Sequence, residues 1–193
     1  MAEKIKYNPG KGISPVAFMF ACPGQKEQQS GRVVAGMTGK NLNTLLSILM
    51  ESENENIREL FPSANRYDYL ITNASDTIHY PALDNTSLPS KGEYSDDANL
   101  NRLYHEFDHT KYVIAFGTQA KEAAKLVEYK YELREVTPRP KFITSLPHLS
   151  LLALNQISED VNGERIERGA PDATHKRLEV VAQMLTENLA KIF

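Results

Sequence analysis

The sequence contains a single cysteine, Cys22, which excludes an internal disulfide and a metal cluster held by several cysteines. It has no apolar run close to the length of a membrane span and no visible signal peptide, so we expect a cytoplasmic protein without a membrane partner. Positive charge is also scarce, because 22 Lys and Arg residues stand against 25 Asp and Glu residues, for a net charge of −3. A protein with this balance must concentrate its cations locally if it binds nucleic acid.

The remaining composition is that of an ordinary globular chain. Its 193 residues are 41% hydrophobic and 24% charged, which is sufficient for one domain with a full core. No internal repeat or low-complexity tract interrupts the chain. We therefore expect a single domain, residues 1–193, that acts as a monomer.

Short apolar runs alternate along the chain with segments of helical periodicity. Strands are predicted at residues 16–22, 67–75, 111–117 and 142–147. Helices are predicted at residues 42–50, 96–109, 118–129 and 173–193. This alternation predicts an α/β fold with three α/β/α layers around a short, mostly parallel four-stranded sheet. Three other segments are expected to be a loosely held arm, a long surface loop and a connection with an acidic patch: residues 1–15, 76–94 and 149–171.

A long polar loop follows the first predicted strand and precedes leucines at helical spacing. Its glycines are Gly24, Gly31, Gly36 and Gly39. Such a loop lies at the carboxyl end of a strand, where open α/β sheets bind ligands.

The ends of the four predicted strands supply candidate site residues. They are Ala21, Cys22, Pro23, Gly24 and Gln25 at the end of the first, Thr72, Asn73, Ser75 and Asp76 at the end of the second, Gly117 and Thr118 at the end of the third, and Pro147, His148, Leu149 and Ser150 at the end of the fourth. Parallel strands would bring these groups to one edge of the sheet. The Asn73 amide offers a donor and an acceptor, which suits the edge of a pyrimidine base. The alternative is an asparagine that only satisfies backbone groups at a strand end.

Residues 20–42 resemble the first motif of the uracil-DNA glycosylase superfamily, and most of all the branch whose loop reads GEAPGxxE…GRPFVGxAGxxL. The positions in register are Pro23, Gly24, Glu27, Gly31, Arg32, Gly36, Gly39 and Leu42. The segment His148-Leu149-Ser150 resembles the second motif, HPS followed by apolar residues, with Leu149 in place of the usual proline. The resemblance covers residues 20–155 and implies a short parallel sheet with its site at the strand ends.

The resemblance implies how the base is held. Asn73 falls on the asparagine that reads a flipped base, and backbone N–H groups near Ala21, Cys22 and Gln25 also hold it. His148 falls on the histidine that stabilises negative charge on the departing base. The residues expected to bind the base are Ala21, Cys22, Pro23, Gly24, Gln25, Val34 and Asn73. The alternative for His148 is a histidine packed at a strand end.

The resemblance also implies contacts to DNA outside the base. Ser150 would hold a phosphate, and Leu151 or Leu152 would wedge into the gap that the flipped base leaves. Arg32 and Lys40, near the glycine loop, are expected to contact phosphates. The alternative for the leucines of residues 151–154 is a place in the core.

The chain departs from the resembled branch at its catalytic chemistry. The branch carries four cysteines for an iron–sulfur site, and this chain has one, so neither cofactor nor metal is expected. The two positions before Pro23 often hold a carboxylate or amide, but here they are Ala21 and Cys22. Neither is a general base at its ordinary pKa, although a cysteine with a depressed pKa could be. Asp76, and after it Glu27, are therefore the candidates for positioning water; a loop-capping aspartate is the alternative for Asp76.

Val34 stands where the branch has a phenylalanine that stacks on the flipped base. Valine has no π-face and a smaller volume. This substitution favours a pocket wider than a uracil pocket, and sequence drift in a loop that still takes uracil is the alternative.

These features predict a monofunctional DNA glycosylase that flips out a uracil-like or modified pyrimidine and hydrolyses its N-glycosidic bond, leaving an abasic site. The catalytic candidates are His148, Asn73 and Asp76. The partner is double- or single-stranded DNA. One substrate is a bulky 5-substituted cytosine, such as glucosylated hydroxymethylcytosine in phage DNA, which implies anti-phage defence; the other is uracil in ordinary repair.

Three other classes compete with this prediction. The string from His105 to His109 matches the HExxH pattern of zinc metallopeptidases, but on a helix both histidines would face water. Residues 36–40 approach a phosphate-binding loop, but Val34 and Asn41 stand where that motif needs glycine and Ser or Thr. The third class is a non-catalytic DNA-binding module, which the acidic balance disfavours.

Overall fold

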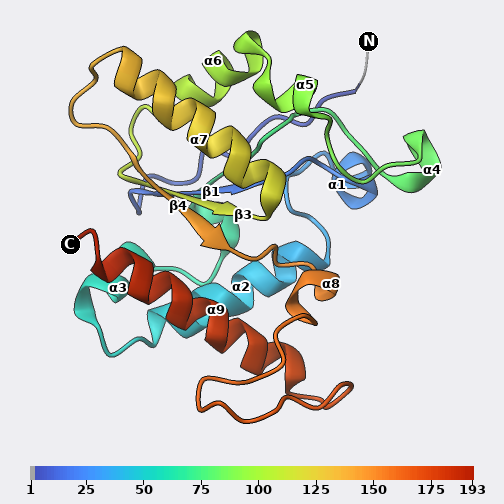
Figure 1. The fold of residues 1–193 in the computed structure, drawn as a ribbon, viewed down its shortest axis with the longest axis vertical. Coiled ribbons are helices and arrows are strands. Elements are labelled where there is room, and N and C mark those ends of the chain that lie inside the picture. Colours follow the sequence, from blue (N-terminus) through green and yellow to red (C-terminus); the bar gives the residue numbers. More distant parts are fainter. Residues whose placement is uncertain (1–2) are drawn as a thin grey trace.

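The computed structural model describes residues 3–193, which contain a four-stranded sheet with helices on both faces (Figure 1). The strands are β1 (Val16–Phe20), β2 (Leu70–Asn73), β3 (Tyr112–Phe116) and β4 (Lys141–Leu146). All neighbouring strands are parallel, in the order β2-β1-β3-β4. The predicted three-layer α/β/α class is therefore confirmed.

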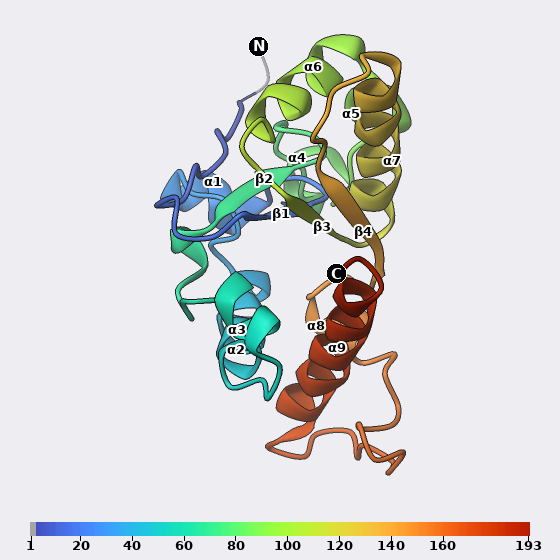
Figure 2. The ribbon, with the colours of Figure 1, turned by 90° about the vertical axis from the view of Figure 1, so that its left-hand side faces the viewer.

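The helices form a layer on each side of the sheet. Figure 2 shows α2 (Met37–Met50), α3 (Glu55–Leu60) and α9 (Ala173–Ala190) on one face and α5 (Lys91–Ser95), α6 (Asp97–Glu106) and α7 (Thr118–Leu133) on the other. Shorter helices follow three of the strands: α1 (Gln25–Ser30) after β1, α4 (Pro81–Asp84) after β2 and α8 (Leu151–Leu154) after β4. A short 3-10 helix, Arg66–Asp68, precedes β2. Within residues 3–193, no helix is both long and apolar enough to cross a bilayer.

Strand β1 is buried on both faces, and its side chains alternate between two cores. Phe18 and Phe20 belong to the core shared with α2 and α9, whereas Ala17 and Met19 belong to the core shared with α6 and α7. The alternation follows from the strand period of two. Burial on both faces explains why this segment reads as a continuous apolar run.

The two helical layers meet the sheet through different side chains. The first layer is rich in buried leucines: Leu42, Leu45, Leu46, Leu49, Leu178, Leu185 and Leu189. Burying each leucine fully contributes roughly 1.5–3 kcal/mol. Helix α7 instead packs through the small side chains of Ala120, Ala123 and Ala124, all of them fully buried.

Several predicted boundaries are wrong. The first strand ends at Phe20 rather than residue 22, and the helix predicted at 42–50 already begins at Met37. The helix that starts at Thr118 continues to Leu133, four residues past its expected end. Helices α1 and α4 were expected as loop; because they bury none of their side chains, they carry no apolar periodicity to detect.

The prediction of a loosely held N-terminal arm is also wrong for the residues described. Asn8 exchanges two backbone hydrogen bonds of 2.8 Å with Ile71, and its side-chain amide donates to the carbonyl of Tyr69 at 2.7 Å. Ile5 is buried, and its N–H donates to the carbonyl of Asp76 at 3.1 Å. The arm therefore lies antiparallel along the outer edge of β2 and covers it.

A close backbone approach shapes the loop between β1 and α2. Gly39 lies in the first turn of α2, where a Cβ would stand 1.9 Å from the carbonyl oxygen of Val34 and 2.7 Å from Nε of Arg66. Val34 has a φ of 51°, which is uncommon for a β-branched residue. The tight fit at Gly39 therefore helps to hold Val34 in a strained conformation.

Gly39→Ala should destabilise the protein by roughly 1–3 kcal/mol, because the added Cβ must displace Val34. For a chain of this size, each kcal/mol lowers Tm by about 2–4 °C in a thermal melt. Gly92→Ala is the matched control, since a Cβ at Gly92 within α5 would approach only Oγ of Ser90, at 3.9 Å. Its Tm should be unchanged or slightly raised. A Gly39→Ala variant that melts with the wild type would contradict the close packing.

Candidate functional site

A cavity of about 1100 Å³ opens at the carboxyl ends of the four strands. It exceeds the roughly 300–1,000 Å³ of most small-molecule sites. Residues from the end of every strand line it: Ala21, Cys22 and Gly24 after β1, Asn73 at the end of β2, Gly117 and Thr118 after β3, and Pro147 and His148 after β4. The prediction that the four strand ends meet at one edge is confirmed.

His148 presents a neutral N–H donor to this cavity. The backbone N–H of Ser150 donates to its Nδ1 at 3.0 Å, so the proton of the neutral ring lies on Nε2. Among residues 3–193, Nε2 has no hydrogen-bond partner. The ring packs edge-on against Phe20, with 5.9 Å between ring centroids. Burial lowers the pKa of His148 below its usual value, because desolvation disfavours the imidazolium ion.

Gly117 makes room for this imidazole. Its φ is 87°, in the left-handed region that favours glycine. A Cβ at Gly117 would lie 3.2 Å from Cβ and 3.3 Å from Cδ2 of His148. Any side chain at the end of β3 would therefore press on the histidine at the end of β4.

Asn73 places an unsatisfied amide in the same cavity. It is the last residue of β2, paired in register with Phe20 of β1, and it is 4% exposed. Within the described part of the chain, its buried Nδ2 has no hydrogen-bond partner. Leaving such a donor unpaired costs about 1–3 kcal/mol, so the side chain is poised for a ligand that accepts its hydrogen.

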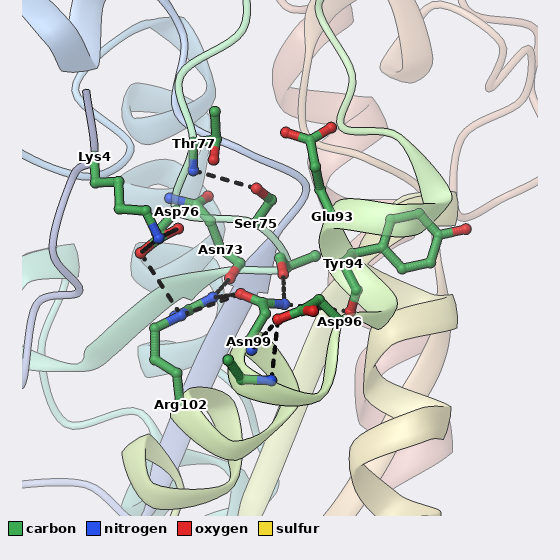
Figure 3. Close-up of polar contacts among 12 residues, drawn as sticks. Lys4, Asn73, Ser75, Asp76, Thr77, Glu93, Tyr94, Asp96, Asn99 and Arg102 are labelled. Atoms are coloured by element: carbon green, nitrogen blue, oxygen red, sulfur yellow. Dashed lines mark hydrogen bonds and ion pairs between the residues drawn. The ribbon is translucent and has the colours of Figure 1, made fainter. Parts of the chain in front are cut away.

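A polar network behind Asn73 fixes the end of β2. Arg102 of α6 donates to the carbonyl of Asn73 at 2.9 Å, and the amide of Asn99 donates to the carbonyl of Ala74 at 2.7 Å (Figure 3). Glu106 forms an ion pair of 2.8 Å with Arg102. Because these groups engage the backbone, the Asn73 side chain is left free to face the cavity.

Glu27 is the one carboxylate that residues 3–193 contribute to the cavity wall. Its Oε2 accepts the N–H of Gly24 at 3.1 Å, and its Oε1 accepts the N–H of Ala35 at 3.0 Å. The carboxylate thus ties together the two ends of the loop that resembles the first motif. Each oxygen retains a lone pair for a further donor such as water.

Cys22 lines the cavity but is chemically inert as a base. Burial, together with the nearby carboxylates of Glu93, Asp84 and Glu27, raises the pKa of its thiol to about 12. The possibility of a depressed thiol pKa is therefore wrong. A neutral thiol is left in the wall, next to the backbone carbonyl of Ser87 at 3.5 Å.

The wall beside Cys22 belongs to the segment between β2 and α6, and His79 holds that segment together. Its Nδ1 contacts Asp84 at 2.5 Å and its Nε2 contacts Glu93 at 2.8 Å. Burial alone would lower the pKa of His79, but the two carboxylates outweigh this effect and raise it above its usual value. The same segment places Ser87 and Leu88 in the cavity wall.

Asp76 is not brought to this cavity, which corrects its prediction as the water-positioning residue. Its carboxylate pairs with Lys4 of the N-terminal arm at 3.0 Å and lies 4.0 Å from Nε of Arg102. Figure 3 shows these three side chains together. They line a separate cavity of about 480 Å³. The arm, which was predicted to be loosely held, supplies the cation that pairs with Asp76.

The other predicted residues divide into two groups. Those that line the large cavity are Ala21, Cys22, Gly24, Val34, Asn73, His148, Ser150 and Leu152. Those outside its lining are Pro23, Gln25, Arg32, Lys40 and Leu151. Arg32 stacks on Tyr67, 3.7 Å above the ring centroid, and Lys40 is exposed.

The leucines after His148 differ in their exposure to solvent. Leu149 and Leu154 are fully buried core residues, whereas Leu151 is 42% and Leu152 is 79% exposed. Ser150 caps this short helix by accepting the N–H of Ala153 at 3.3 Å. Only the two exposed leucines are therefore available as wedges.

Lys121 was missed by the sequence analysis. It lies in the first turn of α7 and lines the cavity, and within residues 3–193 it forms no ion pair. No local pattern indicates it, because α7 reads as an ordinary amphipathic helix. Only the position of that helix after β3 brings the lysine to the site.

The HExxH interpretation fails on geometry. His105 and His109 are exposed, whereas the Glu106 carboxylate turns inward to Arg102 and to the Thr72 hydroxyl. No cluster of three or more His, Cys, Asp or Glu side chains suited to a metal occurs in the part of the chain that the structure describes. Glu106 is the counter-ion of a structural arginine.

The fold and the cavity together define an α/β/α protein with a large cavity at the carboxyl edge of a parallel sheet. No protein-family model matches the sequence, and a comparison with curated proteins found no match. Function is therefore inferred from the residues of the cavity themselves.

The pKa values of His79 and His148 should depart in opposite directions from 6.5, the ordinary value for histidine, and NMR of the imidazole protons can measure both. The native pKa of His79 is raised, so this residue stabilises the fold below pH 6.5, and that stabilisation is lost as pH rises through the native pKa. His79→Gln should therefore lower the free energy of unfolding more at pH 5.5 than at pH 8.5. The lowered native pKa of His148 has the opposite effect on stability. As pH falls, the unfolded state takes up the proton before the native state does, so the native state loses stability. His148→Gln should cost less at pH 5.5 than at pH 8.5, and the same sign in both variants would contradict the assignment.

Proposed function

We propose that this chain is a monofunctional DNA glycosylase of the uracil-DNA glycosylase superfamily. The observation that carries the proposal is a pair of donors in one cavity: the buried, unsatisfied Nδ2 of Asn73, and the Nε2–H of a neutral His148, which has no partner within residues 3–193. These lie on the positions that resemble the base-reading asparagine and the histidine of that superfamily. The substrate is a pyrimidine nucleotide flipped out of double- or single-stranded DNA.

In this proposal, the base edge satisfies Asn73. A pyrimidine offers an acceptor to the amide N–H and either a donor or an acceptor beside it. Because an amide can rotate, Asn73 suits both a uracil-like and a cytosine-like edge. The gain is that a donor unpaired in the free protein becomes paired in the complex.

His148 then acts on the leaving group. As the bond between C1′ and the ring nitrogen breaks, its electron pair moves to the base, and negative charge develops on the base oxygens. The Nε2–H of His148 donates to the 2-carbonyl oxygen and stabilises that charge, in a buried site where such an interaction is strong. The imidazole needs no proton transfer for this role, which fits its lowered pKa.

Glu27 replaces Asp76 as the candidate for positioning water. Water bonds to C1′ through its oxygen and loses a proton, and the departing base takes up a proton in turn. A carboxylate already held by Gly24 and Ala35 can orient this water through a remaining lone pair. The product is an abasic site.

The exposed leucines of α8 lie next to the cavity mouth and supply the wedge. Leu152 both lines the cavity and exposes 79% of its surface. A large exposed aliphatic side chain is unfavourable in water, but it can fill the gap left in a base stack. Ser150, at the start of the same helix, lies within the same wall.

Lys121 favours a second candidate, a bifunctional glycosylase that forms a Schiff base. The neutral amine of Lys121 would attack C1′ as the bond to the base breaks with its electron pair on the base, and the new C–N group would lose a proton; the bond from C1′ to the ring oxygen then opens, the oxygen takes up a proton and an iminium ion forms. Borohydride reduction would then trap the protein on DNA, and Lys121→Met would abolish the trapping. An alkali-labile product without trapping would identify hydrolysis instead.

His148→Ala should reduce single-turnover excision by on the order of 10²-fold or more, the loss expected when one preorganised transition-state partner is removed. The substrates are duplexes that each carry one uracil or modified pyrimidine, and alkali cleavage reports the abasic product. DNA affinity should change little, because the imidazole contacts only the reacting base.

The matched control is His175→Ala, at an exposed histidine of α9 outside the cavity wall. Its excision rate should equal that of the wild type. If His148→Ala keeps the wild-type rate on every excised base, His148 is a packing residue and the proposed chemistry is wrong. Absence of excision from the whole panel would favour a DNA-binding module.

The base should be larger than uracil, such as 5-hydroxymethylcytosine or its glucosylated form. Val34 lines a cavity of about 1100 Å³ and leaves space that an aromatic ring would fill. Val34→Phe should therefore slow excision of the bulky bases while sparing or improving that of uracil. Fast excision of uracil by the wild type, without excision of any bulky base, would contradict the hypothesis of an enlarged pocket. Val34→Ala is the matched control, because it changes the same cavity-lining residue but enlarges the space instead of filling it.

A further inference from the structure

A further cavity, of about 650 Å³, lies beside the large one and is lined by the segment after α8 and by α9. Gln156 and Ile157 line both cavities, so the two adjoin. Three arginines line this cavity, Arg165, Arg168 and Arg177, against one carboxylate, Glu167. The cations therefore prevail at the cavity wall, although not over the whole segment, whose other carboxylates lie outside the lining: Glu159, Asp160 and Glu164.

Arg177 is the buried member of the group. The residue is 3% exposed, and its Nε–H donates to the carbonyl of Ile157 at 3.0 Å. Its two terminal nitrogens have no hydrogen-bond partner within residues 3–193, and no carboxylate there pairs with it. Because Arg177 lines the cavity, these nitrogens are available to an anion that enters it, and a largely buried guanidinium without a counter-ion favours such a ligand.

Arg165 and Arg168 extend the cationic surface to solvent. Both are exposed, and neither forms an ion pair with any residue from 3 to 193. The neighbouring Asp160 does not neutralise them by contact, since its carboxylate accepts the N–H groups of Asn162 and Glu164 in its own turn. Guanidinium groups bind phosphate oxygens through paired N–H donors. Three of them at one cavity therefore favour a phosphate as the ligand.

We propose that Arg177, Arg165 and Arg168 form a phosphate site, and that its occupant is a phosphodiester of the strand whose base enters the large cavity. The assignment to that strand rests on the proposed function. Gln156 and Ile157 line both cavities and Leu152 lines the large one, so the arginine site adjoins the cavity that the flipped base would enter. It thereby supplies the local cations that a DNA enzyme of negative net charge requires.

The test measures affinity for a duplex that contains no odd base, so it does not depend on excision. Arg165→Ala/Arg168→Ala changes two exposed side chains, and Arg58→Ala/Arg139→Ala removes the same charge from two exposed arginines elsewhere. The first variant should lose affinity on the order of tenfold, and its slope of log K against log salt should fall by about 0.9 for each phosphate lost. The second variant should bind as the wild type does.

A thermal-shift titration with inorganic phosphate distinguishes the source of the ligand. Phosphate should raise the Tm of the wild type more than that of Arg165→Ala/Arg168→Ala, because mass action stabilises the state that binds. A phosphate effect without any arginine-dependent DNA affinity would overturn the strand assignment and leave a site for a free phosphate. Equal behaviour of both variants in both assays would overturn the site altogether.

The same variants separate this inference from the proposed function. Arginine-dependent DNA affinity without excision of any base would support the phosphate site and refute the glycosylase. Excision by the wild type with unchanged affinity in Arg165→Ala/Arg168→Ala would support the glycosylase and refute the site.

Discussion

The parallel pairing of β1 with β2 and β3 is the constraint on which the site depends. Parallel strands end at the same edge, so segments separated by more than 100 residues, such as Cys22 and His148, line one cavity. The pairing places Phe20 beside Asn73 and, through β3, brings Gly117 against His148. Burial of β1 on both faces makes this register hard to change, since a slip by one residue would exchange the side chains of the two cores.

Electrostatics at this edge follows from which polar groups the fold satisfies. Arg102 and Glu106 neutralise each other while holding the end of β2, and His79 is balanced between Asp84 and Glu93. Asn73 and Arg177 differ, because within residues 3–193 the buried Nδ2 of Asn73 has no partner and the terminal nitrogens of Arg177, which line a cavity, have none either. The satisfied networks stabilise the walls, and the unsatisfied donors mark where ligands are proposed to bind. Val34 adds backbone strain to the same wall, another feature that gathers at functional sites.

Much of the architecture could be predicted because the spacing of apolar residues along the chain indicates the strands and the main helices. Apolar runs marked the four strands, and leucine spacing marked α2 and α9, since those residues face the core directly. Helices α1 and α4 could not be found in this way, because they bury no side chain. The edge pairing of the arm through Asn8 was equally hidden, since it depends on a partner strand more than 60 residues away.

For the site, the sequence by itself determined which residues stand at the strand ends. Asn73 and His148 could be predicted because each lies at the end of a strand that is recognisable as an apolar run. Only the tertiary structure decided the rest. It placed Asp76 in another cavity, where it pairs with Lys4, left Glu27 as the carboxylate in the wall among residues 3–193, and brought Lys121 to the same wall. Burial in the fold also raises the pKa of the Cys22 thiol and lowers the pKa of the His148 imidazole. The physical reason is that charge pairing and desolvation depend on neighbours in space, and the chain order of this protein does not reveal them.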